Sequence, residues 1–361
     1  MLEKQNYMVG PILERFGLNT GERSVQSLDS GLINKTWKVN ANSKSYILQR
    51  INTHVFKRPE EIDENLSKLK KYLKQQFPDY LFVAPIAAPD GLTLIESADG
   101  VFRLFDFVDG SRTIDSVKTS SEAFEAARQF GKFSRLLSGF NADDLAYTLP
   151  DFHNLTLRYE QFTAALAQGS EERLENAREV IEFIKANESI VLTYNKILAN
   201  SSIPHRVIHH DTKISNVLFD ADNKGLCVID LDTVMPGFYI SDVGDMMRTY
   251  LSPANEEETD LSQVEVRKDF FAAIFKGYFS EMGVALTKAE KDLFIYSGEF
   301  IIYMQAIRFL TDYLNDDVYY GARYPEHNLN RALNQITLLV KYMNLTADFE
   351  EIIKVALAEP A

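Results

Sequence analysis

Residues 1 to about 105 alternate between apolar and polar positions in short runs, which is the pattern of half-buried strands. Between two of these runs, Ile62, Leu66, Leu69 and Leu73 recur at helical spacing and predict a helix over 59–76. The alternating runs predict strands at 36–40, 45–50, 91–96 and 101–108. An α+β arrangement is therefore expected for this part of the chain.

Helical periodicity dominates after residue 108, where the alternation stops. The predicted helices span 120–137, 155–167, 172–199, 241–251, 264–281, 287–314 and 326–344. We therefore predict an α+β fold in two parts. A small β-rich N-terminal lobe is expected at 1–107, and a large, mostly helical C-terminal lobe is expected at 108–361.

The 361 residues are 45% hydrophobic and 25% charged, an ordinary balance for a globular protein. The formal net charge of −14 argues against a nucleic-acid partner, since such proteins need clustered Lys and Arg. No apolar run approaches the roughly 18 residues required to span a bilayer, and the first residues lack the pattern of a signal peptide. With Cys227 as its one cysteine, the protein is expected in a reducing cytoplasm, without membrane contact or an obligate protein partner.

The stretch from His209 to Asn216 reads H-x-D-x-K-x-x-N, and an apolar strand that ends in Asp230 follows it. These residue types match the requirements of phosphoryl transfer from Mg²⁺-ATP, in which one carboxylate receives the proton of the attacking hydroxyl and oxygen ligands hold the metal. Asp211 fits the role of that carboxylate. Asn216 and Asp230 fit the roles of metal ligands, because magnesium prefers oxygen donors and takes few of them from protein.

The spacing of these residues predicts that they meet. Two apolar runs flank a turn cluster at 220–225, so they predict a hairpin. The end of its second strand is expected to place Asp230 beside Asn216. Lys213 lies two residues after Asp211, which is close enough to offset the charge of a transferring phosphate.

This constellation resembles the protein-kinase-like superfamily, and in particular its small-molecule branch of aminoglycoside, choline and homoserine kinases. That branch has H-x-D-x-x-x-x-N followed by a strand ending in Ile-Asp, which is matched here by His209, Asp211, Asn216 and Asp230. Protein kinases have Asp-Phe-Gly at the second position, where this chain has Asp-Leu-Asp at 230–232. The resemblance implies a bilobal small-molecule kinase that uses ATP and Mg²⁺.

The resemblance also implies a phosphate-binding loop and a cation on the third strand. The candidate loop contains Ser30, Gly31 and Asn34, which could offer polar groups and backbone to the phosphates. On the third strand, alternation puts Arg50 on one face and Gln49 on the other. If the first face meets the nucleotide, Arg50 is the phosphate ligand; if the second does, this strand supplies no cation.

A hinge that receives adenine is the third implied feature. Residues 105–109 form an extended apolar stretch, in which backbone groups near Phe107 and Val108 are expected to be free. Such a pocket would be apolar with few polar groups. Ordinary core packing is the alternative explanation for the aromatic residues.

Further segments resemble the N-acetylhexosamine 1-kinases, bacterial enzymes that phosphorylate the anomeric hydroxyl of N-acetylglucosamine and N-acetylgalactosamine. The segments are 46–49, 52–53, 209–213, 229–237, 308–314 and 324–329. By this resemblance Asp211 deprotonates the sugar 1-hydroxyl, and Arg308, Tyr319 and Tyr320 contact the sugar. A structural ion pair is the alternative for Arg308, and packing is the alternative for the tyrosines. Leu32 stands where the family has a His, which leaves the sugar preference open.

Two other functions are consistent with the sequence. The acceptor could be choline, an aminoglycoside or homoserine, since the whole branch shares the motif. The second alternative is a pseudokinase that binds nucleotide without catalysis. The ambiguity at Gln49 and Arg50 favours it, whereas the intact Asp211, Asn216 and Asp230 argue against it.

Overall fold

The computed structural model describes residues 2–18, 23–28 and 33–358. Its N-terminal part is built on a five-stranded antiparallel sheet of order β1-β2-β3-β5-β4. The strands are β1 (Arg23–Leu28), β2 (Lys35–Ala41), β3 (Lys44–Ile51), β4 (Ile95–Ser97) and β5 (Gly100–Asp106). The register sets Gln49 opposite Arg103, so these two side chains lie on the same face of the sheet.

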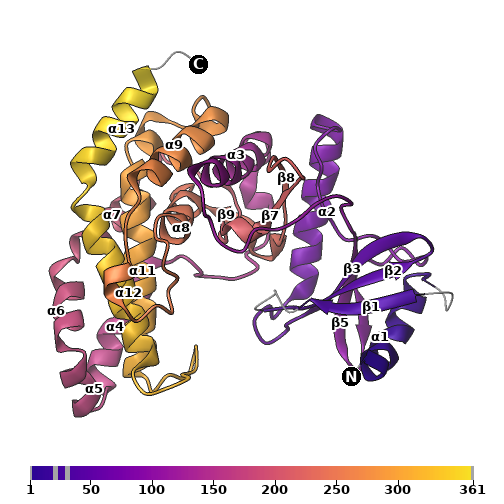
Figure 1. The fold of residues 1–361 in the computed structure, drawn as a ribbon, viewed down its shortest axis with the longest axis horizontal. Helices are drawn as coiled ribbons and strands as arrows, with labels where there is room; N and C mark the ends of the chain where they lie inside the picture. The colour runs from indigo at the N-terminus through magenta and orange to yellow at the C-terminus, as the bar shows by residue number, and fades with distance from the viewer. Residues whose placement is uncertain (1, 19–22, 29–32, 359–361) are drawn as a thin grey trace.

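Helix α1 (Leu2–Arg15) covers the other face of the sheet, at the N-terminal end of the chain (Figure 1). Its Val9 and Ile12 belong to the same apolar cluster as Leu48 of β3. This packing makes the sheet one-sided, with an apolar face under α1 and a more polar face opposite. We did not predict α1, because a Gly-Pro pair interrupts its apolar stripe.

The C-terminal part is mostly helical. Its helices are α3 (Ser120–Leu136), α4 (Leu155–Gln168), α5 (Glu171–Asn176), α6 (Arg178–Ala186), α7 (Ser189–Leu198), α8 (Ile240–Tyr250), α9 (Lys268–Met282), α10 (Lys288–Lys291), α11 (Phe294–Leu314), α12 (His327–Met343) and α13 (Thr346–Ala358). The central helix is α11, which is buried along most of its length and packs against α4, α8 and α12.

Helix α2 (Pro59–Gln76) has the bounds that the sequence predicted, and it stands between the sheet and the helical part in Figure 1. Its Leu66, Leu69 and Leu73 join the large core of the helical part instead of the core under α1. The helix therefore ties the two parts together through apolar burial. With this arrangement the predicted bilobal α+β fold is confirmed.

Two of the predicted helices are divided in the structure. The predicted helix over 172–199 is α5, α6 and α7, because one continuous helix would turn Asn187 and Glu188 toward the apolar side. The predicted helix over 287–314 is α10 and α11, and the fully buried Glu290 carboxylate of α10 pairs with Arg206. Strand β1 and helices α1 and α13 are additional to the prediction.

Two small antiparallel pairs within the helical part carry the H-x-D motif. They are β6 (Arg206–Ile208) with β9 (Met235–Gly237), and β7 (Val217–Phe219) with β8 (Gly225–Val228). The motif connects β6 to β7 through the 3-10 turn η2 (Ile214–Asn216), and the 3-10 turn η3 (Leu231–Thr233) follows β8. Within the described ranges, no helix has the length and apolar character needed to cross a membrane.

Candidate active site

The loop between β6 and β7 brings three of the predicted site residues into contact. Asn216 donates from Nδ2 to the Asp211 carboxylate at 3.0 Å and to the Asp211 carbonyl at 2.9 Å. Lys213 Nζ lies 2.9 Å from the same carboxylate. Burial opposes ionisation of Asp211, but the charge and hydrogen bond of Lys213 and the Asn216 hydrogen bond outweigh it and hold the pKa of Asp211 below its usual range. Asp211 is therefore an ionised acceptor at neutral pH.

Asp230 lies next to Asn216 across the β7–β8 hairpin. The Ile229 amide donates to the Asn216 carbonyl at 2.8 Å, which continues the ladder to Asp230. Asp230 has a φ of 59°, an uncommon conformation for a residue other than glycine. Although the residue remains accessible to solvent, the surrounding protein raises the pKa of Asp230 to about 7, and the negative charges of Asp232 and Asp211 add to this effect. A cation bound here would relieve the repulsion.

Two carboxylates of α8 hold the loop in place from the helical side. Asp242 accepts from the backbone amides of His209 and His210 at 3.0 and 2.7 Å. Asp245 accepts from the Thr212 amide at 2.8 Å. Because buried backbone N–H groups must find acceptors, these bonds fix the path of a loop that has few ladder contacts of its own.

His210, which precedes Asp211, is uncharged in the fold. It is buried, and its Nδ1 donates to the carbonyls of Thr233 and Ile208 at 3.1 and 3.2 Å. Burial lowers the pKa of His210 to about 4. In the unfolded chain a histidine pKa is about 6.5, so between these two values the unfolded state binds a proton that the folded state does not.

Acid should therefore weaken the fold through His210. Between about pH 7.5 and about pH 5 the loss amounts to about 2 kcal/mol of unfolding free energy from this group. The variant His210→Asn removes the titration and tolerates the positive φ of 66° at this position. Urea unfolding at both pH values should show that the wild type loses about 2 kcal/mol more than His210→Asn on acidification. Equal losses in the two proteins would contradict the lowered pKa.

The sheet face opposite α1 meets the η3 segment through a buried ion pair. Arg103 Nη2 lies 2.6 Å from the Asp232 carboxylate, and both side chains are almost fully buried. Arg103 also donates to Gln49 Oε1 from Nε and Nη2, at 3.1 and 2.8 Å. Asn34 donates to the other Asp232 oxygen at 2.7 Å. Asp232 thus links the two lobes at a position two residues after Asp230.

Gln49, and not Arg50, occupies the face of β3 that meets this segment. Arg50 lies on the α1 side of the sheet and donates to the Asp99 carbonyl at 3.2 Å. The predicted phosphate ligand is therefore not brought to the site, because strand alternation turns it away. The buried cation on the site face is Arg103 of β5. The sequence could have indicated Arg103, because it is a charged residue in the middle of an otherwise apolar strand.

Three residues were predicted to form the phosphate-binding loop. Ser30 and Gly31 lie outside the described residues. Asn34 is buried at the start of β2, and its side-chain oxygen accepts from the Asn52 amide at 2.9 Å. Since its nitrogen donates to Asp232, both ends of the Asn34 side chain bind protein groups.

Two of the backbone groups at the expected hinge bind other protein groups. The Phe107 amide donates to the Ser45 carbonyl at 3.1 Å, which extends the β3–β5 ladder by one residue. The Val108 carbonyl accepts from the Ser111 hydroxyl at 2.6 Å. These bonds engage the Phe107 N–H and the Val108 C=O. The predicted adenine contact at Phe107 and Val108 therefore rests on the Phe107 C=O and the Val108 N–H, and it stays a prediction. The Lys38 ammonium lies 3.7 Å from the centre of the Phe107 ring and covers it from the sheet side.

The three predicted sugar-contacting residues lie together in the helical part. The Arg308 guanidinium on α11 is 5.6 Å from the centre of the Tyr320 ring and 6.0 Å from that of Tyr319. It is also 5.6 Å from the Phe152 ring. Its polar partner in the described part of the chain is the uncharged Gln305 side chain, at 3.3 Å. The alternative of a structural ion pair at Arg308 is thus not found among these residues.

Aromatic contacts join this group to the H-x-D loop. The Phe152 ring stacks on His153 with 4.5 Å between centres, and the His153 ring lies 5.3 Å from that of His210. Burial, with the nearby positive charge of Arg308, lowers the pKa of His153 well below 6.5, so this ring is neutral. A chain of ring contacts therefore runs from Arg308 to His210, the residue before Asp211.

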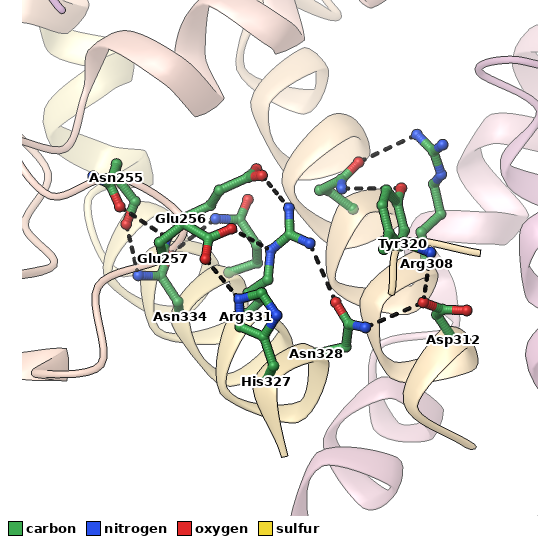
Figure 2. A network of polar contacts seen from close by, with 12 residues as sticks. Asn255, Glu256, Glu257, Arg308, Asp312, Tyr320, His327, Asn328, Arg331 and Asn334 are labelled. Atoms are coloured by element: carbon green, nitrogen blue, oxygen red, sulfur yellow. Dashed lines mark hydrogen bonds and ion pairs between the residues drawn. The ribbon is translucent and has the colours of Figure 1, made fainter. Parts of the chain in front are cut away.

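Asp312 positions the segment that carries the two tyrosines (Figure 2). Its carboxylate accepts from the amides of Tyr319 and Tyr320 at 2.7 and 2.9 Å and from Asn328 Nδ2 at 3.1 Å. These charge-assisted bonds hold the backbone after α11 in a fixed turn. The Tyr320 ring is thereby kept beside Arg308.

The same network continues from Tyr320 back to the H-x-D loop. Arg331 on α12 lies over the Tyr320 ring at 5.2 Å and pairs with Glu256. Glu256 also pairs with Arg248 at 2.9 Å, and Arg248 pairs with Asp245 at 3.0 Å. Because Asp245 holds the loop amide at Thr212, the loop and the tyrosine segment are mechanically connected.

Replacing Asp312 with Asn should loosen the tyrosine segment. The variant would present a donor to two backbone amides, so the KM for the acceptor should rise about tenfold with little change in kcat. The matched control is Asp316→Asn, because the Asp316 side chain is 80% exposed. Steady-state kinetics on both variants measures the effect. An unchanged KM in Asp312→Asn would show that the tyrosine segment does not serve the acceptor.

A model of the phosphotransferase enzyme family matches residues 24–278, a span that includes both the sheet and the H-x-D loop. The chain belongs to the phosphotransferase enzyme family. The match covers more than two thirds of the chain and ends within α9. Arg308, Tyr319 and Tyr320 lie beyond it, so the family match does not test their predicted contact with the acceptor.

Solved structures share the fold of this family member. An aminoglycoside phosphotransferase from Alicyclobacillus acidocaldarius is 13% identical with a TM-score of 0.64, and 95% of each chain is covered. A microcompartment-associated aminopropanol kinase is 16% identical with a TM-score of 0.64, covering 95% of this chain and 98% of that one. A spectinomycin phosphotransferase in complex with ADP and spectinomycin is 13% identical with a TM-score of 0.55, covering 98% and 97%. At these identities the likeness establishes the fold and not the acceptor.

Proposed function

We propose that this phosphotransferase is an ATP- and Mg²⁺-dependent kinase of a small sugar, acting on the anomeric 1-hydroxyl of an N-acetylhexosamine. The observation that carries the proposal is the meeting of Asp211, Lys213 and Asn216 on one loop beside Asp230. This set contains a carboxylate for the acceptor hydroxyl, a cation for the phosphate and oxygen donors for a metal. The ADP bound to the spectinomycin phosphotransferase supports a nucleotide as the donor.

The transfer step follows from the position of Asp211. The acceptor hydroxyl gives its proton to an Asp211 carboxylate oxygen, and its own oxygen bonds to the γ-phosphorus. The bond between the γ-phosphorus and the bridging oxygen breaks, and ADP leaves with that electron pair. Because the pKa of Asp211 is lowered, this carboxylate acts first by orienting the hydroxyl and accepts the proton late. Lys213 offsets the charge of the transferring group.

The residues that would hold Mg²⁺ fit that ion. Asn216 turns its amide nitrogen toward Asp211, which leaves its side-chain oxygen for a metal. Asp230 adds a carboxylate whose pKa is raised first by the surrounding protein and further by the negative charges of Asp232 and Asp211. Two protein oxygens with phosphate and water completing the shell are typical of Mg²⁺. When bound, the ion neutralises charge on the β- and γ-phosphates.

The sugar acceptor is supported by the grouping of Arg308, Tyr319 and Tyr320, together with the resemblance of their segments to N-acetylhexosamine 1-kinases. Aromatic rings and a guanidinium offer a stacking face and directional donors to a hydroxylated ring. An amino alcohol is the second candidate acceptor. The likeness to the aminopropanol kinase, with a TM-score of 0.64, favours it.

An acceptor panel tests the proposal. The protein would be supplied with ATP and Mg²⁺ and with N-acetylglucosamine, N-acetylgalactosamine, aminopropanol, choline, homoserine or an aminoglycoside in turn, and ADP release would be measured. We expect turnover with an N-acetylhexosamine and loss of its reducing end, since a 1-phosphate blocks it. Turnover restricted to the amino alcohols would overturn the sugar assignment and leave the kinase assignment intact.

A further inference from the structure

A pocket of about 400 Å³ lies between α4 and α11. Its volume suits a ligand of monosaccharide size. The lining combines two cations with aromatic and small polar groups, and these residues are Arg158, Arg308, Thr311, Asp312, Tyr319 and Tyr320. Arg308, Tyr319 and Tyr320 are the predicted sugar-contacting residues described above. Arg158 of α4 has no role in that prediction.

The two arginines of the pocket have uncharged partners in the described part of the chain. Arg158 donates to the Gln161 side chain at 2.9 Å and to the Asp151 carbonyl at 2.8 Å. Arg308 donates to the Gln305 side chain at 3.3 Å. A partly buried guanidinium usually pairs with a carboxylate, as Arg248 and Arg331 nearby do. The pocket therefore presents two cations whose charge no carboxylate cancels directly.

Asp312 does not supply the missing charge. Its carboxylate lies in the same lining, but it accepts from two backbone amides and from Asn328. These bonds turn its oxygens toward the tyrosine segment (Figure 2). Arg158 and Arg308 each contribute one positive charge to the lining, and Asp312 contributes one negative charge. The net side-chain charge of the lining is thus +1.

Two polar atoms of the lining are buried without a hydrogen-bond partner among the described residues. They are Arg158 Nε and the Thr311 hydroxyl. Buried polar groups in native proteins are nearly always satisfied, and a bound ligand is one of the explanations for an exception. Gln305 Nε2 donates to the Tyr320 hydroxyl oxygen at 3.4 Å, which leaves the Tyr320 O–H free to donate to a ligand. Arg158 Nε, the Thr311 hydroxyl and the Tyr320 O–H can therefore each donate a hydrogen bond to a ligand. The Thr311 oxygen can also accept one.

The positive charge of the two arginines also favours an anionic ligand. Burial and the charge of Arg308 lower the pKa of Arg158, which shows that the two guanidiniums repel each other across the pocket. The chain as a whole carries a net charge of −14, so this cationic spot contrasts with its surroundings. Planar guanidinium groups match the oxygens of carboxylate, sulfate and phosphate.

We propose that this pocket binds an anionic substituent of the acceptor, so that the substrate is an acidic sugar carrying a carboxylate, sulfate or phosphate group. This inference rests on the proposed function, since it takes the α11 side as the acceptor side. Arg308 of the pocket lies over the Phe152 ring, which stacks on His153, and the His153 ring lies beside His210, the residue before Asp211. Two cations in the proposed acceptor region also repel a protonated amino alcohol, which disfavours the second candidate acceptor.

Binding without turnover provides the first test. Isothermal titration would compare N-acetylglucosamine with its 6-sulfate, its 6-phosphate and its 3-O-lactyl ether, which place a sulfate, a phosphate and a carboxylate on the same sugar. We expect at least one acidic sugar to bind about tenfold or more tightly than the neutral parent, and Arg158→Gln to remove this difference. The control is Arg178→Gln, since Arg178 is 65% exposed and pairs with an exposed carboxylate on a neighbouring helix.

Turnover then separates this inference from the kinase assignment. The acidic sugar that binds best should exceed the neutral parent in kcat/KM by about tenfold, through KM, and Arg158→Gln should abolish the advantage. Equal kcat/KM for neutral and acidic sugars in wild type would overturn the anion pocket while the kinase assignment stands. If acidic sugars bind through Arg158 but none of the acceptors is phosphorylated, the kinase assignment fails and the pocket stands.

Discussion

Replacing Asp211 with Asn should lower the kcat of ATP-dependent phosphoryl transfer by about 10²–10⁴-fold, with little change in the KM for ATP. The amide keeps the shape of the side chain and can still accept from Asn216. It cannot take the proton of the acceptor hydroxyl, and it no longer balances the charge of Lys213, which lies 2.9 Å away. The loss should therefore appear in the chemical step and not in nucleotide binding.

Asp222→Asn is the matched control for this variant. Asp222 is an exposed carboxylate in the turn of the nearby β7–β8 hairpin, so the same change there should leave kcat as in wild type. Steady-state kinetics would be combined with titration of ATP to each protein in the absence of acceptor. An Asp211→Asn variant that retains at least a third of the wild-type kcat would show that another group receives the proton.

The second large effect is expected at Arg103. This side chain is the buried cation on the site face of the sheet, and its charge acts on Asp230 as well as on Asp232. Arg103→Met should raise the KM for ATP about tenfold or more, because the face then lacks its buried cation. It should also lower the unfolding free energy by about 3–5 kcal/mol, since Asp232 would remain as an unpaired buried charge.

A double variant separates these two effects. Arg103→Met combined with Asp232→Asn removes both charges, so most of the lost stability should return. If Arg103 also serves the nucleotide, the KM for ATP stays raised in this stable double variant. Arg50→Gln is the control, because Arg50 lies on the opposite face and should leave the KM for ATP unchanged. If both the unfolding free energy and the KM for ATP return to wild-type values in the double variant, Arg103 has only a structural role.

The H-x-D loop was predictable from the sequence because local spacing determines its geometry. Asp211, Lys213 and Asn216 lie within one short loop, and the hairpin that follows has a length that returns Asp230 to Asn216. Helix α2 was predicted for the same reason, since its apolar stripe is regular. In these cases neighbouring residues in the sequence are also neighbours in space.

The cation of the sheet was not predictable in this way. Alternation divided the faces of β3 correctly, but it could not say which face meets the helical lobe. The partner of Asp232 is Arg103, which is far from it in sequence and reaches it only after both lobes have folded. The engagement of the Phe107 N–H was not predictable for a similar reason, because it depends on how far the β3–β5 ladder extends.

The predicted acceptor region contains residues that the sequence singled out and one that it did not. Arg308, Tyr319 and Tyr320 were singled out from the resemblance of their segments, and the structure brings them together. Arg158 was not, because it comes from α4 and gains meaning only from the pocket that it shares with Arg308. A second positive charge in that pocket is a tertiary property, and it changes the expected chemistry of the acceptor.

Phosphorus NMR of one reaction tests the central claim most directly. The protein would be incubated with ATP, Mg²⁺ and the N-acetylhexosamine acceptors, neutral and acidic, and the phosphorus spectrum would be followed with time. The account predicts that the ATP signals give way to those of ADP together with a new phosphate monoester coupled to the anomeric proton, and that Asp211→Asn prevents this. Unchanged ATP with every acceptor, or equal conversion by Asp211→Asn, would contradict it.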